Sequence, residues 1–186
     1  MAPKQKITEQ MILEAAFLLT RKHGYEHVNA RSLASELGCS TQPIFSRFES
    51  MDALKKAFHS YAGNYFNSYA ADAMQGGDSF RKLGECYIKF ACTESNLFRL
   101  LFMSEVMDLH GFEHMYDDLE NLEVAENLAS AMSISLESAK RFYMKMFIFT
   151  HGIASMAATG FVQLEAGEAE KLLAEAQAAF AAQHTS

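Results

Sequence analysis

Proline, tryptophan and cysteine are scarce in this chain of 186 residues. It has only two prolines, which excludes collagen-like and proline-rich chains. It has no tryptophan, and its three cysteines are too few and odd in number for a disulfide framework. This sparse set indicates a reducing compartment, and we expect a cytoplasmic protein. The three are Cys39, Cys86 and Cys92.

Long hydrophobic runs are also missing. The first ten residues are polar and charged, without the apolar core of a secretory signal. The most apolar stretch, 142–162, contains Lys145 and His151 and is diluted by small and polar residues. A bilayer span needs about 20 predominantly apolar residues, so we expect no membrane partner.

The residue types that are abundant favour helices. Hydrophobic residues make up 49% of the chain and charged residues 21%, which is a globular composition. Fifteen Phe and eleven Met stand against few Val and Ile, and β-branched residues are the ones that strands prefer. The composition therefore predicts an all-α protein.

The net charge of −7 is unevenly distributed along the chain. Residues 1–60 carry eight basic and six acidic side chains, a net charge of +2. Residues 61–186 carry eight basic and seventeen acidic side chains, a net charge of −9. This asymmetry indicates that the N-terminal end meets a polyanion such as nucleic acid.

Apolar residues recur at helical spacing along the whole chain. Thr8 to His23 reads as an amphipathic helix, and Gly24 follows it where a left-handed cap is expected. Asn29 and Ser40 are N-caps for two short helices. The expected helices cover 8–23, 30–37, 41–47, 50–74, 79–93, 96–109, 112–132, 135–160 and 165–183.

A helix-turn-helix pattern occupies residues 30–48. Ala34 is small enough for the second helix to cross closely, and Gly38, four residues on, permits a tight turn. Such a unit presents its second helix to the DNA major groove. An ordinary pair of helices joined by a glycine turn is the alternative. The apolar side chains expected between the two helices are Leu33, Leu37 and Ile44.

The first 60 residues resemble the N-terminal domain of the TetR family of bacterial transcriptional regulators. The remainder resembles that family in architecture. The resemblance implies a three-helix DNA-binding domain over 1–50 and a helical effector-binding and dimerisation domain over 51–186. It implies a repressor whose partners are an inverted-repeat operator and a small apolar or aromatic effector. The matching residues are Gly24, Tyr25, Asn29, Arg31, Leu33, Ala34, Leu37, Gly38, Ser40, Ile44, Phe45, Phe48 and Leu54.

The resemblance also implies which residues contact DNA. Base edges or nearby phosphates are expected to meet Thr41, Gln42 and Ser46. Gln42 is chemically suited to this, because its amide can pair bidentately with adenine. Contacts with phosphate, which position the domain without reading sequence, are expected from Arg31, Arg47 and Lys55.

The sequence departs from the family pattern at two positions. Phe45 stands where the family usually has a tyrosine that helps to hold phosphate, and Met51 stands where it often has a lysine. Lys55 and Lys56 lie one turn further along. We expect Phe45 and Phe48 to belong to the core. Near the N-terminus, an arm along the DNA backbone and a solvated terminus are equal alternatives for Lys4 and Lys6.

The segment from Phe142 to Ala158 is apolar almost all round, so it should be buried on more than one side. One side would face the chain's own core and the other a second chain. A stripe of small residues allows close helix approach there. We therefore expect a homodimer formed through the last two helices, with a monomer built around a buried helix as the alternative. The stripe consists of Gly152, Ser155 and Thr159.

Methionine and aromatic residues are frequent in the body, and Met adapts its shape to apolar ligands. Stripes of such residues more often form an ordinary core, which is the alternative. The helix from Ser50 would connect the body to the DNA-reading unit, and Gly63 in it is either a bend or a point where another helix passes. His151 is the expected polar anchor of the ligand. The expected effector site consists of Phe66, Tyr69, Phe102, Met103, Tyr143, Phe147 and His151.

Two other classes of function compete. The segment His110-Gly-Phe-Glu-His114 matches a pattern in which two histidines hold zinc while Glu113 activates water, which predicts a hydrolase. A structural metal site would instead use His110, His114 and Asp117. A dimeric carrier of an apolar ligand would leave the pattern in residues 1–60 unexplained. With no glycine-rich phosphate loop and no nucleophile elbow, we expect neither an enzyme nor a cofactor.

Overall fold

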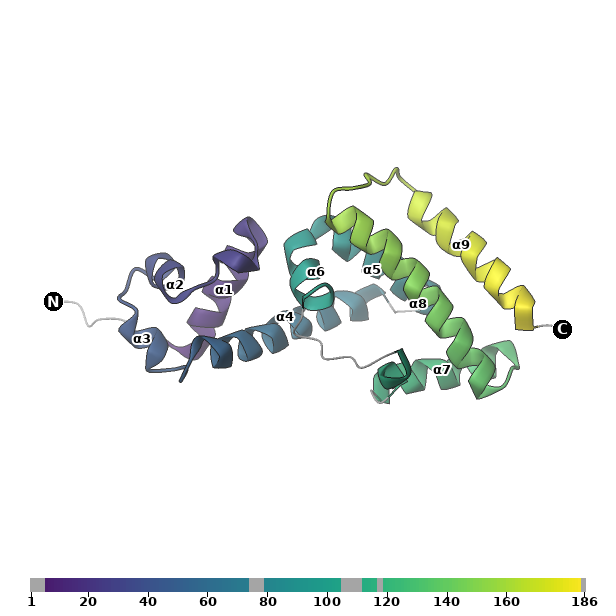
Figure 1. Cartoon of the computed structure of the whole chain (residues 1–186), viewed down its shortest axis with the longest axis horizontal. Coiled ribbons are helices and arrows are strands. Elements are labelled where there is room, and N and C mark those ends of the chain that lie inside the picture. The colour runs from purple at the N-terminus through teal and green to yellow at the C-terminus, as the bar shows by residue number, and fades with distance from the viewer. Residues whose placement is uncertain (1–5, 74–78, 105–111, 117–118, 185–186) are drawn as a thin grey trace. The chain divides into compact units, whose positions relative to one another are not determined.

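The computed structural model describes residues 6–73, 79–104, 112–116 and 119–184 (Figure 1). Every regular element within these ranges is helical, which confirms the all-α prediction. Short 3-10 turns lie at η1 (Tyr25–His27), η2 (Phe112–Tyr116) and η3 (Ala182–His184). The α-helices are α1 (Glu9–His23), α2 (Ala30–Glu36), α3 (Gln42–Phe45), α4 (Met51–Ala73), α5 (Ser79–Thr93), α6 (Ser95–Phe102), α7 (Leu119–Met132), α8 (Leu136–Ala158) and α9 (Glu168–Ala181).

The chain divides into two compact units. Unit 1 contains α1, α2, α3, α4 as far as Tyr69, and α6. Unit 2 contains the end of α4 from Ala70, together with α5, α7, α8 and α9. Helix α4 therefore contributes to both units. The functional division expected at residue 50 is a different boundary and stays a prediction.

Capping residues set the helix ends in unit 1. The Thr8 side chain accepts a backbone N–H of the first turn of α1. Gly24 ends that helix with φ of 94°, a region that glycine enters without steric cost. The Asn29 side chain accepts two backbone N–H groups of α2, while the Ser32 hydroxyl accepts the N–H of Asn29. These reciprocal bonds fix where α2 begins, as the sequence predicts.

The core of unit 1 is assembled from one buried stripe on each of its first four helices. Their fully buried side chains meet where the helices cross, and their removal from water is the main stabilising term. Helix α6 packs against α1 and η1. The fully buried side chains of α1 to α4 include Ile12, Ala16, Leu33, Ile44, Leu54, Phe58 and Ala62.

Three elements differ in extent from the sequence prediction. Helix α3 is shorter than the expected 41–47, because the Arg47 N–H bonds the Ile44 carbonyl three residues back and tightens the end of the turn. Helix α6 ends at Phe102, and residues 105–109 of the expected helix lie outside the described residues. The expected helix over 112–132 is a 3-10 turn followed by α7.

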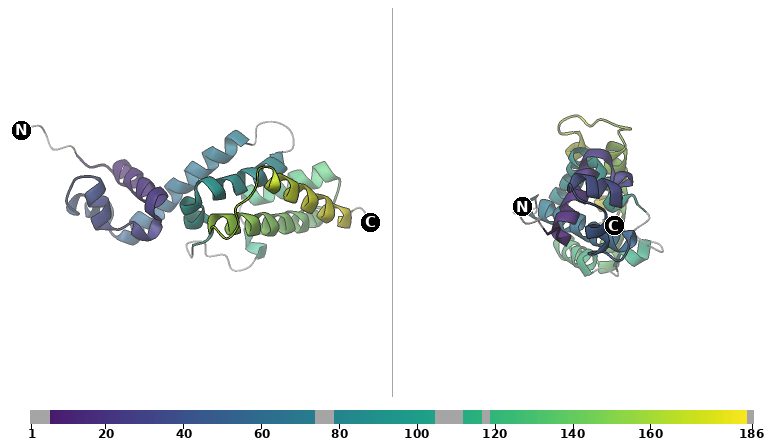
Figure 2. Two further views of the ribbon diagram at one scale, coloured as in Figure 1. Left: turned by 90° about the horizontal axis from the view of Figure 1, so that it is seen from above. Right: turned by 90° about the vertical axis from the view of Figure 1, so that its left-hand side faces the viewer.

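Helix α8 is the centre of unit 2, where it packs against α5, α7 and α9. It begins at an N-cap, Ser135, whose hydroxyl accepts a backbone N–H of the first turn. Helices α8 and α9 run side by side (Figures 1 and 2). No helix in the described part of the chain has the length and apolar character to cross a membrane. The buried residues of α8 are Ala139, Phe142, Tyr143, Met146, Thr150, Ile153, Ala154 and Ala158.

Candidate functional site

Helices α2 and α3 are joined by a tight turn in unit 1. Gly38 has φ of 62°, in the left-handed region that disfavours other residues. The Cys39 N–H donates to the Ala34 carbonyl at 2.9 Å, which closes the turn. Leu33 of α2 and Ile44 of α3 are both fully buried, as expected for the side chains that hold the two helices together. This is the geometry of a helix-turn-helix.

Helix α3 presents a polar face to solvent. Ile44 points into the core, whereas Gln42 and Ser46, four residues apart and therefore on one face, are exposed. Thr41, at the N-cap, is half-buried. The Ser46 hydroxyl donates to the Pro43 carbonyl at 2.8 Å, so its proton is engaged within the turn. The residues expected to meet base edges are thus gathered at α3.

Phe45 does not belong to the core, and the expectation that it would is wrong. Its side chain is 50% exposed, whereas Phe48 is 6% exposed. The reason is helical register. Phe48 lies four residues after the buried Ile44 and on the same side, while Phe45 is rotated by about 100° from Ile44.

The predicted phosphate contacts are all exposed in unit 1. Arg31 lies in the first turn of α2. The Arg47 Nε donates to the Ile7 carbonyl at 3.2 Å, which ties the start of the described chain to the end of α3. Lys55 lies 4.0 Å from Asp52 on α4. Of the two terminal lysines, Lys6 is exposed and Lys4 lies outside the described residues.

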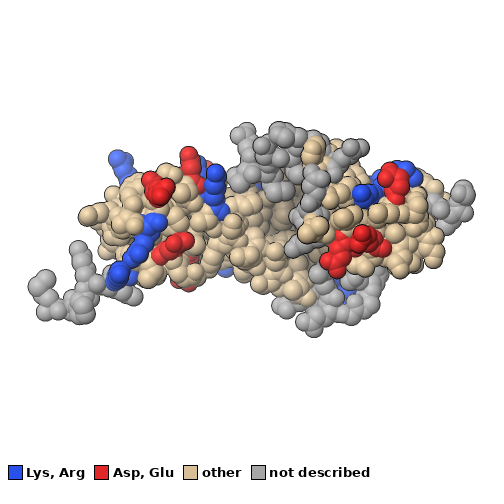
Figure 3. Space-filling view, turned by 90° about the horizontal axis from the view of Figure 1, so that it is seen from below, with Lys and Arg blue, Asp and Glu red and all other residues tan. Residues whose placement is uncertain are grey.

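Basic and acidic side chains are mixed on the face drawn in Figure 3. Lysine and arginine there lie beside aspartate and glutamate. On this face the described cations do not form a uniformly basic surface.

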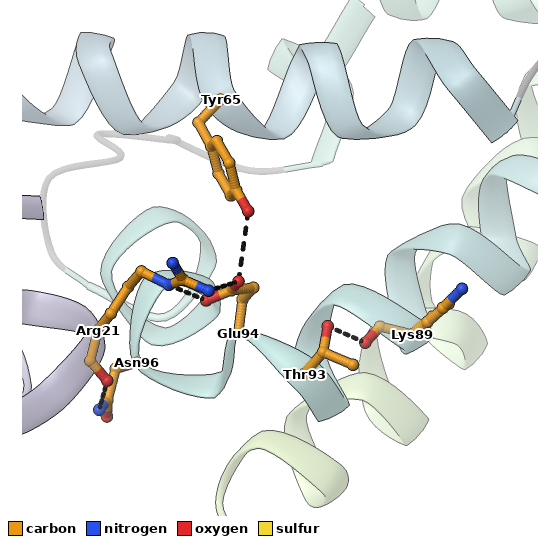
Figure 4. Close-up of polar contacts among 6 residues, drawn as sticks. All are labelled: Arg21, Tyr65, Lys89, Thr93, Glu94 and Asn96. Carbon is orange, nitrogen blue, oxygen red and sulfur yellow. Dashed lines mark hydrogen bonds and ion pairs between the residues drawn. The ribbon is translucent and has the colours of Figure 1, made fainter. Parts of the chain in front are cut away.

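A charged contact joins α1, α4 and α6 within unit 1 (Figure 4). Arg21 donates to both Glu94 oxygens, from Nε at 2.8 Å and from Nη2 at 2.5 Å. The Tyr65 hydroxyl donates to the same carboxylate at 3.3 Å, and the Asn96 amide donates to the Arg21 carbonyl at 3.1 Å. The Glu94 side chain is only 9% exposed. Its hydrogen bond raises the pKa of Arg21, and burial raises the pKa of Tyr65.

The sequence gives no signal for this contact, because Arg21 and Glu94 are 73 residues apart. A bidentate pair between a guanidinium and a nearly buried carboxylate constrains both distance and angle. It therefore fixes α6 relative to the helix that supports the helix-turn-helix.

The fold of this chain is similar to that of solved structures. A TetR-like transcriptional regulator from Rhodococcus sp. RHA1 matches with a TM-score of 0.65 over 94% of this chain and 95% of its own, at 17% sequence identity. The chain has a TetR-like fold. A protein of unknown function from Rhodococcus sp. RHA1 matches with a TM-score of 0.74 over 100% of both chains, at 19% identity. No protein-family model matches this chain, and no curated protein matches it.

The residues expected to line an effector site fall into both units of this TetR-like fold. In unit 1, the Phe66 and Phe102 rings meet edge to face with centroids 5.0 Å apart, and Phe98 lies 5.1 Å from Phe102. Tyr69 is half-buried, and Met103 is 43% exposed. Phe66 and Phe102 are thus brought together.

In unit 2, Tyr143, Phe147 and His151 follow one another at four-residue intervals on one face of α8. The Phe147 and His151 rings stack with centroids 5.7 Å apart. The Tyr87 hydroxyl, from α5, lies 3.0 Å from His151 Nδ1, and the Tyr143 hydroxyl donates to the Asn121 amide oxygen at 2.6 Å. These five side chains are called the α8 cluster below. They place polar groups within a mainly aromatic setting.

Burial shifts the pKa values of two titratable groups in the α8 cluster. It lowers the pKa of His151, which favours the neutral imidazole, and it raises the pKa of Tyr87. Both groups are therefore uncharged near neutral pH, which suits contact with an apolar or aromatic molecule. Sequence reasoning did not select Tyr87 or Asn121, because only the packing of α5 and α7 on α8 brings them beside His151 and Tyr143.

The competing metal pattern is only partly described. His114 is exposed on η2, and His110 and Asp117 lie outside the described residues. Within the part of the chain that the structure describes, no group of three or more His, Cys, Asp or Glu side chains is arranged to hold a metal ion. The zinc-dependent hydrolase and the structural metal site therefore stay predictions.

Proposed function

We propose that this protein is a transcriptional repressor that binds operator DNA as a homodimer and releases it when a small apolar or aromatic effector binds. The observation that carries the proposal is the exposed polar face of α3. The buried side chains of Leu33 and Ile44 hold α3 in a helix-turn-helix within a TetR-like fold. A recognition helix enters the major groove with such a face toward the bases.

Within this proposal, the residues around α3 have two roles. Gln42 and Thr41 lie where a second helix of this motif meets base edges, with Ser46 as a hydroxyl acceptor beside them. Arg31, Arg47 and Lys55 bind phosphate and set the register of the domain on the duplex. These roles belong to residues 1–50 and, for Lys55, to the second turn of α4.

The homodimer would form through α8 and α9 in unit 2. Ile148 is 48% exposed and Met156 is 40% exposed, although both lie on the longest apolar segment of the chain. Gly152 lies between them at four-residue spacing, and a Cβ placed there would meet no described atom within 4 Å. A large, a small and a large residue along one exposed face suit the close approach of an identical helix.

The effector would bind at the α8 cluster in unit 2, where His151 and Tyr143 supply hydrogen-bonding groups and Phe147 an aromatic wall. The other residues expected to contact the effector lie in unit 1 and stay a separate prediction: Phe66, Tyr69, Phe102 and Met103. An effector lowers operator affinity only if it binds the DNA-incompetent arrangement better, and typical coupling energies are about 1–3 kcal/mol.

In vitro selection from a random-sequence DNA library tests this proposal. The purified full chain should enrich a short inverted repeat, with half-sites about one helical turn or a multiple apart. A library that stays random after several rounds would contradict DNA-binding regulation. Tight binding of an apolar dye by the same preparation would then favour a dimeric carrier of an apolar ligand.

A further inference from the structure

Phe45 is an exposed aromatic ring at the centre of the proposed DNA-reading face. It is 50% exposed, whereas the neighbouring Ile44 is fully buried. Single exposed apolar side chains are ordinary on protein surfaces, so it is the position of this ring beside Gln42, and not its exposure alone, that points to a partner. Phe45 also lies on the same side of α3 as Gln42, three residues earlier.

The position of the ring limits what can cover it. A phenylalanine carries no polar atom, so it cannot hydrogen-bond a phosphate or a polar base edge. Among the base-pair edges of the major groove, the thymine 5-methyl group is the apolar one. Gln42 beside it has the amide that suits adenine, and the thymine paired with that adenine carries its methyl group in the same groove. Gln42 and Phe45 thus favour the same kind of base pair.

We propose that Phe45 determines sequence specificity by packing its ring against the 5-methyl group of a thymine in each operator half-site. This inference rests on the proposed function and adds a specificity-determining residue to it. The thymine lies at, or one base pair from, the position at which Gln42 meets adenine, because the two side chains are neighbours on α3.

Replacing thymine by deoxyuridine removes only the 5-methyl group, and so tests the contact directly. The probe is the inverted repeat enriched by the wild-type protein, with each thymine of both half-sites replaced in turn. Fluorescence anisotropy gives the dissociation constant for each duplex. The wild type should lose about fourfold in affinity per half-site at one symmetric position, the effect of one buried methyl group.

The Phe45→Ala variant should bind the thymine and deoxyuridine duplexes at that position equally. Phe45→Leu, which keeps an apolar side chain, should retain part of the difference. Leu18→Ala is the matched control, because Leu18 is 54% exposed on α1 and away from α3. It should behave as the wild type at every thymine. Phe45 is half exposed, so folding of its variants is checked by circular dichroism and is expected to be unchanged.

Three results would overturn the inference. Deoxyuridine could be tolerated at every position by the wild type, or Phe45→Ala could keep the wild-type sensitivity. A loss of affinity in Phe45→Ala that is equal on all duplexes would assign the ring to a wedge between base steps or to the backbone. In each of these cases sequence-specific binding survives, and with it the proposed function. Failure to enrich any repeat would instead remove both.

Discussion

The side chains in and just after α3 are buried or exposed according to their position around the helical turn. Ile44 and Phe48 share the buried side, while Gln42, Phe45 and Ser46 are exposed. The hydroxyl of Ser46 is already bonded to its own turn, so it can only accept a hydrogen bond from DNA without breaking that contact. Gln42 is consequently the α3 side chain best able to read a base by direct hydrogen bonds.

Gln42→Ala should cost roughly 1–3 kcal/mol of operator binding and relax the preference at one position in each half-site. Lys55→Ala is the matched comparison, because Lys55 is also exposed but is proposed to bind phosphate. It should weaken specific and random duplexes alike and lower the salt dependence by about one unit per protomer. Titrations on the selected repeat and on scrambled DNA distinguish the two. An equal loss on both duplexes for Gln42→Ala would remove Gln42 from base reading.

At the scale of helices, the contact between Arg21 and Glu94 holds α6 to α1. Glu94 is nearly buried, so the loss of its cationic partner leaves a carboxylate that has poor access to water and still accepts a hydrogen bond from Tyr65. The exposed pair between Arg141 and Glu137 on α8 has the same ion types without that burial. The two pairs should therefore differ in their effect on stability.

Arg21→Met should lower the free energy of unfolding by about 1–3 kcal/mol, the cost of leaving the nearly buried Glu94 carboxylate without its cationic partner. Arg141→Met, the matched control, should change it by about 0.5 kcal/mol or less, as for exposed pairs one helical turn apart. Urea unfolding followed by circular dichroism measures both. Comparable losses in the two variants would show that the buried position of Glu94 has no energetic consequence.

Gly63 lies within α4, the helix that contributes to both units. A Cβ at Gly63 would meet no described atom within 4 Å, so within the described chain no helix passes close enough to require a glycine. Of the two explanations that the sequence offers for Gly63, a bend in α4 therefore remains. Gly63→Ala should stabilise the protein by roughly 0.5–1 kcal/mol, because glycine in a helix is unfavourable, and should reduce the response to effector.

The effector response is measured as release of the selected repeat by an aromatic compound identified in a thermal-shift screen. Ser60→Ala, in the same helix, is the control that raises helix propensity without changing a glycine. It should release DNA as the wild type does. An unchanged response in Gly63→Ala, with normal DNA affinity, would rule out the bend as part of the switch.

For the whole molecule, the proposed homodimer would form through the exposed face of α8. Phe180 on α9 is a poor probe of this face, because the Phe180 and Phe149 rings lie 6.3 Å apart within one chain and Phe180→Asp would also disturb that packing. Ile148→Glu changes the exposed face directly. It should weaken dimerisation by at least about 3 kcal/mol, because it buries an unpaired charge, and should abolish tight operator binding.

Sedimentation equilibrium at micromolar concentration measures that assembly. Leu136→Glu is the matched control, because Leu136 is 39% exposed on the same helix but lies three turns away at its first residue. It should remain a dimer. A wild-type monomer that still binds the repeat tightly would contradict assembly through α8 and α9.

Much of the fold could be predicted from the sequence, because capping and apolar periodicity act locally. Asn29 caps α2 where the pattern places it, and Gly38 adopts the left-handed turn. The prediction that Ser40 caps the next helix is wrong, because α3 begins one residue later and its N-cap is Thr41, without a side-chain hydrogen bond. Contacts that join distant segments could not be predicted, such as Arg21 with Glu94 or Tyr87 with His151, since only packing brings them together. The burial predicted for Phe45 is wrong because hydrophobicity alone does not tell the buried side of a short helix from its exposed side.

The central claim is tested most directly by the affinity of the wild-type protein for three duplexes. These are the selected inverted repeat, the same duplex with one half-site randomised, and a scrambled duplex. At near-physiological salt, the complete repeat should bind roughly a thousandfold or more tighter than scrambled DNA. The duplex with one half-site should lose most of that advantage, because only one α3 of the dimer can read it. Equal dissociation constants for all three duplexes would contradict a dimeric, sequence-reading repressor.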